Sequence, residues 1–368
     1  MTISTIIIFL LVLGVIVFIH ELGHFMTAKY FGVKVDEFGL GFPPKIYGKK
    51  KGETEYTLNW IPLGGFVKIA GEDGENRDDP RNFGAKPVWQ RAIILSAGVI
   101  MNFVLAIVIF SAIFMSGFPT DVTGVDKAEL PAGTESYVQI TGISEGSPAE
   151  DAGIMAGDKI LKAGENEVYG VEDLQNYTAE NQGVNVTLTL NRQGETIQKE
   201  VFSRENGNGQ GAIGVSLSEV AIISYSPLEA IKAGFVHTKD LTVYILQYLK
   251  QTLYELFTTG GTTTDVSGPI GMVSMTQQAA QMGFVVLLNF MALISVNLGI
   301  VNILPLPALD GGRIVFLLIE KIKKSPVSTE FEAKIHNAGF MMLMLLMLVV
   351  TVKDIAKLGV WGKIMGMF

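Results

Sequence analysis

The chain has 368 residues, of which 48% are hydrophobic, and its mean hydropathy is +0.37. This is too apolar for a purely soluble protein of this size and indicates several bilayer-spanning helices. The chain has no cysteine, so a metal site must use His, Asp or Glu ligands, and a cysteine nucleophile is excluded. The net charge of -8 argues against nucleic acid as a partner, because phosphate binding needs a basic patch.

Four apolar stretches are long enough, or nearly so, to cross a hydrocarbon core of about 30 Å as helices. They are residues 3–28, 92–115, 284–306 and 340–352 with the flanks of the last. A cleaved signal peptide is the alternative for the first stretch. That stretch has neither a basic amino-terminal region nor an A-x-A-like cleavage site, which favours a membrane span.

The segments between the spans have different characters. Residues 32–90 contain two short alternating runs, which predict a small sheet or hairpin. Residues 117–225 show strand-like alternation and a net charge of -11 between Asp121 and Glu219, which predicts an acidic, water-soluble domain. Residues 226–260 combine apolar side chains with lysines at helical spacing, which predicts an amphipathic helix. The membrane domain would then have two halves, residues 1–116 and 261–368.

Basic residues cluster after the first and third spans, so both of these loops are expected in the cytoplasm. Four spans then place both termini and the acidic domain outside. Three lysines near the carboxyl terminus disagree with that orientation: Lys353, Lys357 and Lys363.

An H-E-x-x-H motif, His20 to His24, closes the first span. Its two histidines lie four residues apart, so they share one helical face and can bind one zinc ion. Glu21 could then take a proton from a zinc-bound water. The alternative is a pair of satisfied core histidines, but polar groups inside an apolar span are costly and need partners or a function.

A catalytic zinc site needs a third protein ligand, and Asp310 is the best candidate. It follows the third span in a stretch where prolines and glycines break the helix. The first and third spans cross in the same direction, so His24 and Asp310 are expected at the same face. His237 and His336 are interpreted as surface or packing residues.

Three asparagines lie in or beside the spans: Asn102, Asn297 and Asn302. They could orient ligands or bind an oxyanion, or they could simply form hydrogen bonds between helices.

Five segments together resemble the site-2 protease family of intramembrane metalloproteases, in its bacterial branch of regulator of sigma-E proteases. They are residues 20–24, 62–72, 97–103, 267–271 and 302–312. The resemblance implies Zn²⁺ bound by His20, His24 and Asp310, with Glu21 as general base. Ala97-Gly98-Val99 departs from the usual A-G-P, so a local kink there is in doubt.

The resemblance also implies that residues 64–69, including Gly64, Gly65 and Phe66, dip toward the active site and offer a strand edge to an unwound substrate. Residues 135–205 resemble one PDZ domain, notably at 146–153, which could bind an extracytoplasmic peptide, shield access or act as a spacer. A single copy resembles the Gram-positive type.

The fold expected is therefore a membrane α-helical protein with four transmembrane helices, a small cytoplasmic-side β insertion and an extracytoplasmic α+β PDZ domain. The expected function is cleavage of single-span membrane proteins in the lipid bilayer of a bacterial plasma membrane, with the active site toward the cytoplasm. The rival hypothesis is a non-catalytic zinc-binding scaffold or transporter. Glu21 argues against the rival, because a pure binder has no need of a carboxylate beside two zinc ligands.

Overall fold

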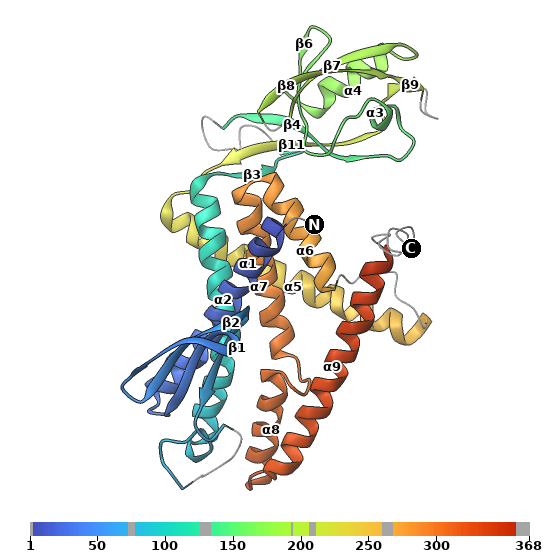
Figure 1. Ribbon diagram of the computed structural model, residues 1–368. Helices are drawn as coiled ribbons and strands as arrows, with labels where there is room; N and C mark the ends of the chain where they lie inside the picture. The colour runs from blue at the N-terminus through green and yellow to red at the C-terminus, as the bar shows by residue number, and fades with distance from the viewer. Residues whose placement is uncertain are drawn as a thin grey trace. The chain divides into compact units, whose positions relative to one another are not determined.

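The computed structural model describes residues 3–72, 78–125, 134–192, 194–205, 211–259 and 268–357. Two residues named above, Lys363 and Ser267 of the 267–271 segment, lie outside these ranges. The chain divides into two compact units. Unit 1 contains residues 1–113 and 227–368, and unit 2 contains residues 114–226 (Figure 1).

Unit 1 is mainly helical. Its helices are α1 (Ile3–Tyr30), α2 (Val88–Ser116), α5 (Pro227–Thr259), α6 (Pro269–Met282), α7 (Phe284–Ile303), α8 (Asp310–Lys323) and α9 (Thr329–Lys357), with a 3-10 turn, η1, at Phe83–Ala85. Among the described residues, α1, α2, α7 and α9 are long and apolar enough to cross a membrane, and they overlap the four stretches predicted as spans. The sequence did not predict α6 or α8 as helices.

The sheet of unit 1 is formed by β1 (Val35–Lys51) and β2 (Thr54–Ile69). It is more than a hairpin, because the first half of β1 pairs with both halves of β2. Four paired segments result, in the order 61–69, 35–42, 54–59 and 45–51. The two outer pairs run in opposite directions, whereas residues 37–40 and 55–58 pair in the same direction. Residues 61–69 pair only with 35–42 in the part of the chain described, so they form one edge of the sheet. This edge lies against α1, where a Cβ at Gly64 would be 2.9 Å from Val17.

The core of unit 1 lies where the ends of α1 and α2 meet the sheet and α8. Its buried members are Ala28, Val33, Val35, Ile69, Phe83, Ile94, Leu95 and Leu317. Burial of these side chains fixes α8 against α2 and so places the first residue of α8, Asp310, relative to the helices.

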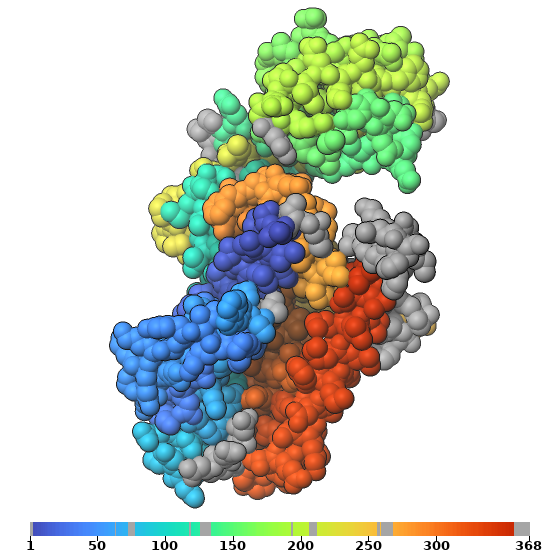
Figure 2. All heavy atoms as spheres, viewed as in Figure 1, coloured from blue at the N-terminus to red at the C-terminus, as the bar shows by residue number. Residues whose placement is uncertain are grey.

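The last helix of unit 1 is packed very differently from α2. Of the most apolar stretch of α9, 6% is buried, against 50% for α2, and Figure 2 shows α9 along the surface of this unit. Its exposed methionines and leucines can face lipid, which is as apolar as they are.

Unit 2 is built on a sheet whose strands run in the order β3 (Phe118–Asp121), β11 (Val215–Ile223), β4 (Ser136–Ile143), β5 (Lys159–Ala163), β7 (Asn185–Arg192) and β8 (Glu195–Phe202), with β6 (Asn166–Glu167) paired to β5. Strands β9 (Arg204–Glu205) and β10 (Gly211–Ala212) pair separately. The helices are α3 (Pro148–Asp151) and α4 (Val171–Glu180). Side chains such as Val138, Ile140, Leu174 and Leu188 form a closed core, so the unit has its own hydrophobic interior.

Candidate metal centre

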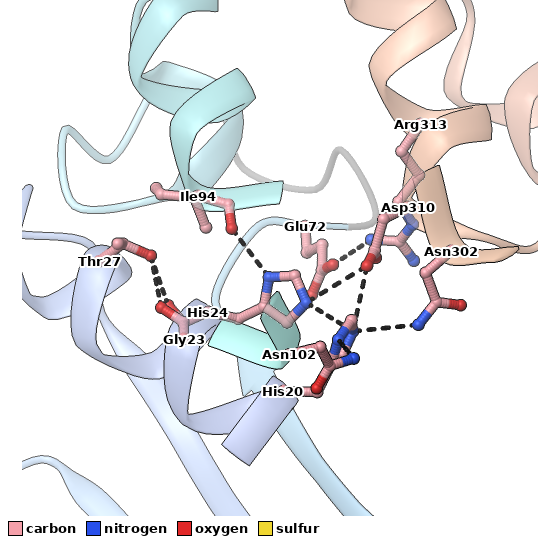
Figure 3. A network of polar contacts seen from close by, with 10 residues as sticks. All are labelled: His20, Gly23, His24, Thr27, Glu72, Ile94, Asn102, Asn302, Asp310 and Arg313. Carbon is pink, nitrogen blue, oxygen red and sulfur yellow. Dashed lines mark hydrogen bonds and ion pairs between the residues drawn. The ribbon is translucent and has the colours of Figure 1, made fainter. Parts of the chain in front are cut away.

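Three side chains from two helices converge on one point in unit 1. The Nε2 atoms of His20 and His24 lie 3.1 Å apart, and the Oδ2 of Asp310 lies 3.1 Å and 3.4 Å from them. Figure 3 shows the three groups pointing toward one another. Among the described residues, this is the one group of at least three His, Cys, Asp or Glu that could hold a metal ion.

The tautomer of His24 shows why a cation fits between these atoms. Its Nδ1–H donates a hydrogen bond of 2.8 Å to the carbonyl of Ile94, so its Nε2 presents a lone pair in the neutral ring. The Oδ2 of Asp310 is buried and accepts no hydrogen bond among the described residues. Lone pairs at such distances repel unless a cation lies between them. Tetrahedral zinc, at about 2.0–2.1 Å from each donor, needs donors about 3.3 Å apart.

The histidines reach this point because α1 and α2 cross at very close range. A Cβ on Gly23 of α1 would collide with the backbone carbonyl of Ala97. A Cβ on Gly98 of α2 would collide with both imidazoles and lie 2.8 Å from the Nε2 of His20. Small residues allow such backbone contact between membrane helices. The centre is therefore closed off by α2, and both histidines are 6% exposed.

Asp310 is presented by the loop that joins α7 to α8, and it is the first residue of α8. The two glycines that follow are needed for the tight return of the chain. A Cβ on Gly311 would meet the carbonyls of Ile303 and Leu304, and one on Gly312 would lie 2.9 Å from the carbonyl carbon of Leu306. The prediction that the helix breaks before Asp310 agrees with this loop.

Two ion pairs fix α8 behind Asp310. Arg313, one turn along, pairs with Glu72, which follows β2 (Figure 3). Further along α8, Glu320 accepts a hydrogen bond of 3.0 Å and a second one from the guanidinium of Arg91 on α2. Sequence reasoning did not predict either pair, because only the fold brings together positions more than 200 residues apart.

Glu21 lies next to His20, and its side chain is directed toward the sheet edge. A Cβ on Gly65 would be 3.8 Å from the Cγ of Glu21, so this side chain lies beside the segment that contains Gly64, Gly65 and Phe66. Pairing at an edge beside Glu21 would bring an extended peptide to this centre.

The asparagines have different surroundings. Asn102 is fully buried, its Nδ2 lies 3.2 Å from Nδ1 of His20, and its Oδ1 has no partner among the described residues. Asn302 lies 3.5 Å from Nε2 of His20, beside the converging donors (Figure 3). Asn297 donates to the carbonyl of Leu293 in its own helix, 3.0 Å away.

The two remaining histidines lie away from the donors. His237 packs edge-on against Phe110, with 4.5 Å between ring centroids. His336 accepts a hydrogen bond of 2.8 Å from the backbone N–H of Ala308, two residues before Asp310. Its interpretation as a surface or packing residue overlooked this contact with the loop, which no sequence pattern indicates.

Comparisons with known proteins agree with this chemistry. The family model described as peptidase family M50 matches residues 8–346. A relative from Clostridium perfringens is 38% identical over 94% of this chain and 97% of its own length. The regulator of sigma-W protease RasP of Bacillus subtilis is 33% identical over 97% of this chain and 100% of its own. Zinc metalloprotease RasP of Oceanobacillus iheyensis is 31% identical over 96% of this chain and 99% of its own length.

A crystal structure of the PDZ domain of the SdrC-like protein from Listeria monocytogenes covers 22% of this chain and 85% of its own, at 21% identity and a TM-score of 0.21. That score is too low to assign the fold of unit 2. The match to the family model and the matches to curated relatives, by contrast, extend over nearly the whole chain. This chain, a membrane protein and a zinc metalloprotease, belongs to peptidase family M50.

Proposed function

We propose that this chain hydrolyses peptide bonds in or near the transmembrane segments of single-span membrane proteins. His20, His24 and Asp310 hold the zinc ion in this proposal, and Glu21 is the general base. The observation that carries it is the convergence of three ligand atoms within 3.4 Å of one another, two of them on a helix apolar enough to span a membrane.

The chemistry that zinc supplies when bound at such a site is the activation of water and the polarisation of the scissile carbonyl. Glu21 accepts the proton of the attacking water at its carboxylate and then delivers it to the leaving amine nitrogen. One C–N bond breaks and one C–O bond forms, so the products are a new carboxylate and a new amine. Gly98 and its neighbours on α2 cover the two histidines, which are 6% exposed.

Two asparagines beside the ligand atoms orient a ligand and the substrate. The buried amide of Asn102 orients His20: a 180° turn of the amide brings its Oδ1 to the Nδ1–H of His20 and leaves Nε2 free to bind metal. The amide of Asn302 is directed at the same region and can donate to the oxyanion that forms on the scissile carbonyl.

The sheet edge formed by residues 61–69 holds the substrate extended. A helical peptide bond is protected by its own hydrogen bonds, and strand addition at this edge exposes it beside Glu21. An apolar cavity of about 310 Å³ lies between this edge and α1, lined by residues that include Leu11, Val15 and Pro62. Its lining suits the apolar side chains of a membrane-derived substrate.

Unit 2 is proposed to be an extracytoplasmic PDZ domain. A groove of about 340 Å³ lies between α4 and the start of β11, lined by residues that include Leu174, Thr178, Ile213 and Val215. An extended peptide could add to β11 in this groove, since residues 215–218 pair only with β4 among the described strands. The active site would face the cytoplasm of a bacterial plasma membrane, as the basic loops suggest. Anti-sigma factors, small division proteins and remnant signal peptides are the candidate substrates.

The experiment that tests the proposal compares the native chain with Glu21→Gln and Asp310→Ala in detergent, on a generic single-span substrate. Glu21→Gln should keep zinc and lose activity by about 10²–10⁴-fold, the usual contribution of a general base. Asp310→Ala should lose zinc. A native chain that holds zinc and cleaves no tested substrate would support the rival hypothesis of a non-catalytic zinc-binding scaffold. Equal cleavage by the native chain and Glu21→Gln would show that Glu21 is not the general base.

A further inference from the structure

The loop that presents Asp310 contains one residue in an unfavourable backbone conformation. Ala308 has a φ of +74°, in the left-handed region where a Cβ costs about 1–2 kcal/mol. The other described residue of this kind, apart from glycines, is Lys324 at the end of α8. A strained residue two positions before a proposed metal ligand needs a contact that holds it.

His336 of α9 makes that contact. Its Nδ1 accepts the N–H of Ala308 at 2.8 Å, so Nδ1 carries no proton and the neutral ring has its proton on Nε2. The ring is held from the side by Phe316 of α8, at 5.5 Å between centroids. His336 therefore lies between the loop and the helix that begins with Asp310.

A glycine on the next turn of α9 allows the loop to come this close. A Cβ on Gly339 would collide with Pro307 and lie 2.8 Å from its carbonyl oxygen. Helix α9 thus contacts two consecutive loop residues, Pro307 through Gly339 and Ala308 through His336. This is notable in a helix that is otherwise little buried.

We propose that His336 is a positioning residue for the metal centre: by accepting the N–H of Ala308 it holds the loop in the conformation that aims Asp310 at the two histidines. The proposal rests on the proposed role of Asp310 as a ligand. In this proposal helix α9, the fourth predicted span, supports the metal site although none of its residues is a ligand.

The test measures zinc affinity by competition with a chromophoric chelator, together with the visible spectrum of the cobalt-substituted protein. His336→Phe keeps an aromatic ring beside Phe316 but cannot accept the hydrogen bond. It should bind zinc about tenfold more weakly, in the range seen when outer-shell partners are removed, and should change the cobalt spectrum. His336→Asn, whose Oδ1 can take the place of Nδ1, should restore both.

Two more variants separate positioning from general stability. His237→Phe makes the same change on α5, beside Phe110, and should leave zinc affinity unchanged. Ala308→Gly, added to His336→Phe, removes the conformational cost at φ +74° and should recover part of the lost affinity.

The outcomes are distinguishable from a failure of the proposed function. If Asp310→Ala retains zinc, the ligand assignment itself fails. If Asp310→Ala loses zinc while a folded His336→Phe protein binds it like the native chain, the positioning role alone is overturned. The same conclusion follows if His336→Asn is as impaired as His336→Phe.

Discussion

Gly98 of α2 lies so close to His20 of α1 that a Cβ at this position would be 2.8 Å from the Nε2 atom of the histidine. The absence of a side chain is therefore what allows α2 to cover the metal centre. A similar contact recurs one turn along α1, where Gly23 meets the backbone of Ala97. Together they make the helix crossing and the candidate metal centre a single structural feature.

Gly98→Ala should therefore abolish or greatly weaken zinc binding. The added methyl group must displace His20 and His24 or push α2 away, and overpacking of this kind costs about 1–3 kcal/mol. Zinc content after purification and chelator competition measure the effect. Gly14→Ala on α1 is the control, because nothing lies within 4 Å of a Cβ there. Normal zinc binding by Gly98→Ala would mean that the crossing is looser than the structure shows.

Asn102→Ala should weaken zinc binding by about 10–100-fold, the usual effect of removing the partner of a ligating histidine. The physical reason is that Nδ1 of His20 would lose the amide that fixes its ring. Both residues are buried, so bulk water does not take the place of the amide. Asn297→Ala is a matched control, since the amide of Asn297 donates to Leu293 of its own helix, and the zinc affinity of this variant should be that of the native chain. Equal zinc affinities for the native chain and both variants would show that Asn102 serves only the packing of the helices.

The sequence was sufficient to predict the spans and to nominate the ligands. Apolar runs of about 20 residues leave few structures other than a membrane helix, and α1, α2, α7 and α9 follow them. The spacing of His20 and His24 depends only on helix periodicity, and the shared direction of the first and third spans brings Asp310 to the same end. The histidine spacing is a local feature of one helix, and the placement of Asp310 requires only the number and order of the spans.

The rest depends on tertiary contacts that no local pattern records. The alternating runs around Tyr56 and Val67 predicted strands, but the pairing of both with residues 37–39 is a matter of register. Helix α8 carries mixed apolar and charged residues and is fixed by the partners of Arg313 and Glu320. The contact of His336 with Ala308 depends on a single backbone angle, which the sequence does not disclose.

Gly64→Ala should lower kcat/KM on a membrane-embedded substrate by about tenfold while zinc content stays unchanged. Gly64 has a φ of +115°, and its Cβ would be 2.9 Å from Val17, so the sheet edge must shift away from α1. Gly52→Ala is the control: it also has a positive φ, of +65°, but lies in the turn between β1 and β2 with open space around it. If both variants lose activity equally, general destabilisation of the sheet would explain the loss, and the edge would have no special role.

The pair formed by Arg91 and Glu320 should stabilise unit 1 in a way that depends on both partners. The side chains are 6% and 17% exposed, and removing one partner of such a pair leaves the other charge buried, at a cost of about 3–5 kcal/mol. Glu320→Met should therefore lower the thermal unfolding temperature in detergent more than the double variant Arg91→Met with Glu320→Met.

The matched surface control is Glu330→Gln, which breaks an exposed ion pair with Lys334 and should change the unfolding temperature little. Since Glu320 lies on the helix that begins with Asp310, Glu320→Met should also lose zinc at a lower temperature than the native chain. Strictly additive effects of the two substitutions would show that α8 is held by its apolar contacts, such as Leu317, and not by the ion pair.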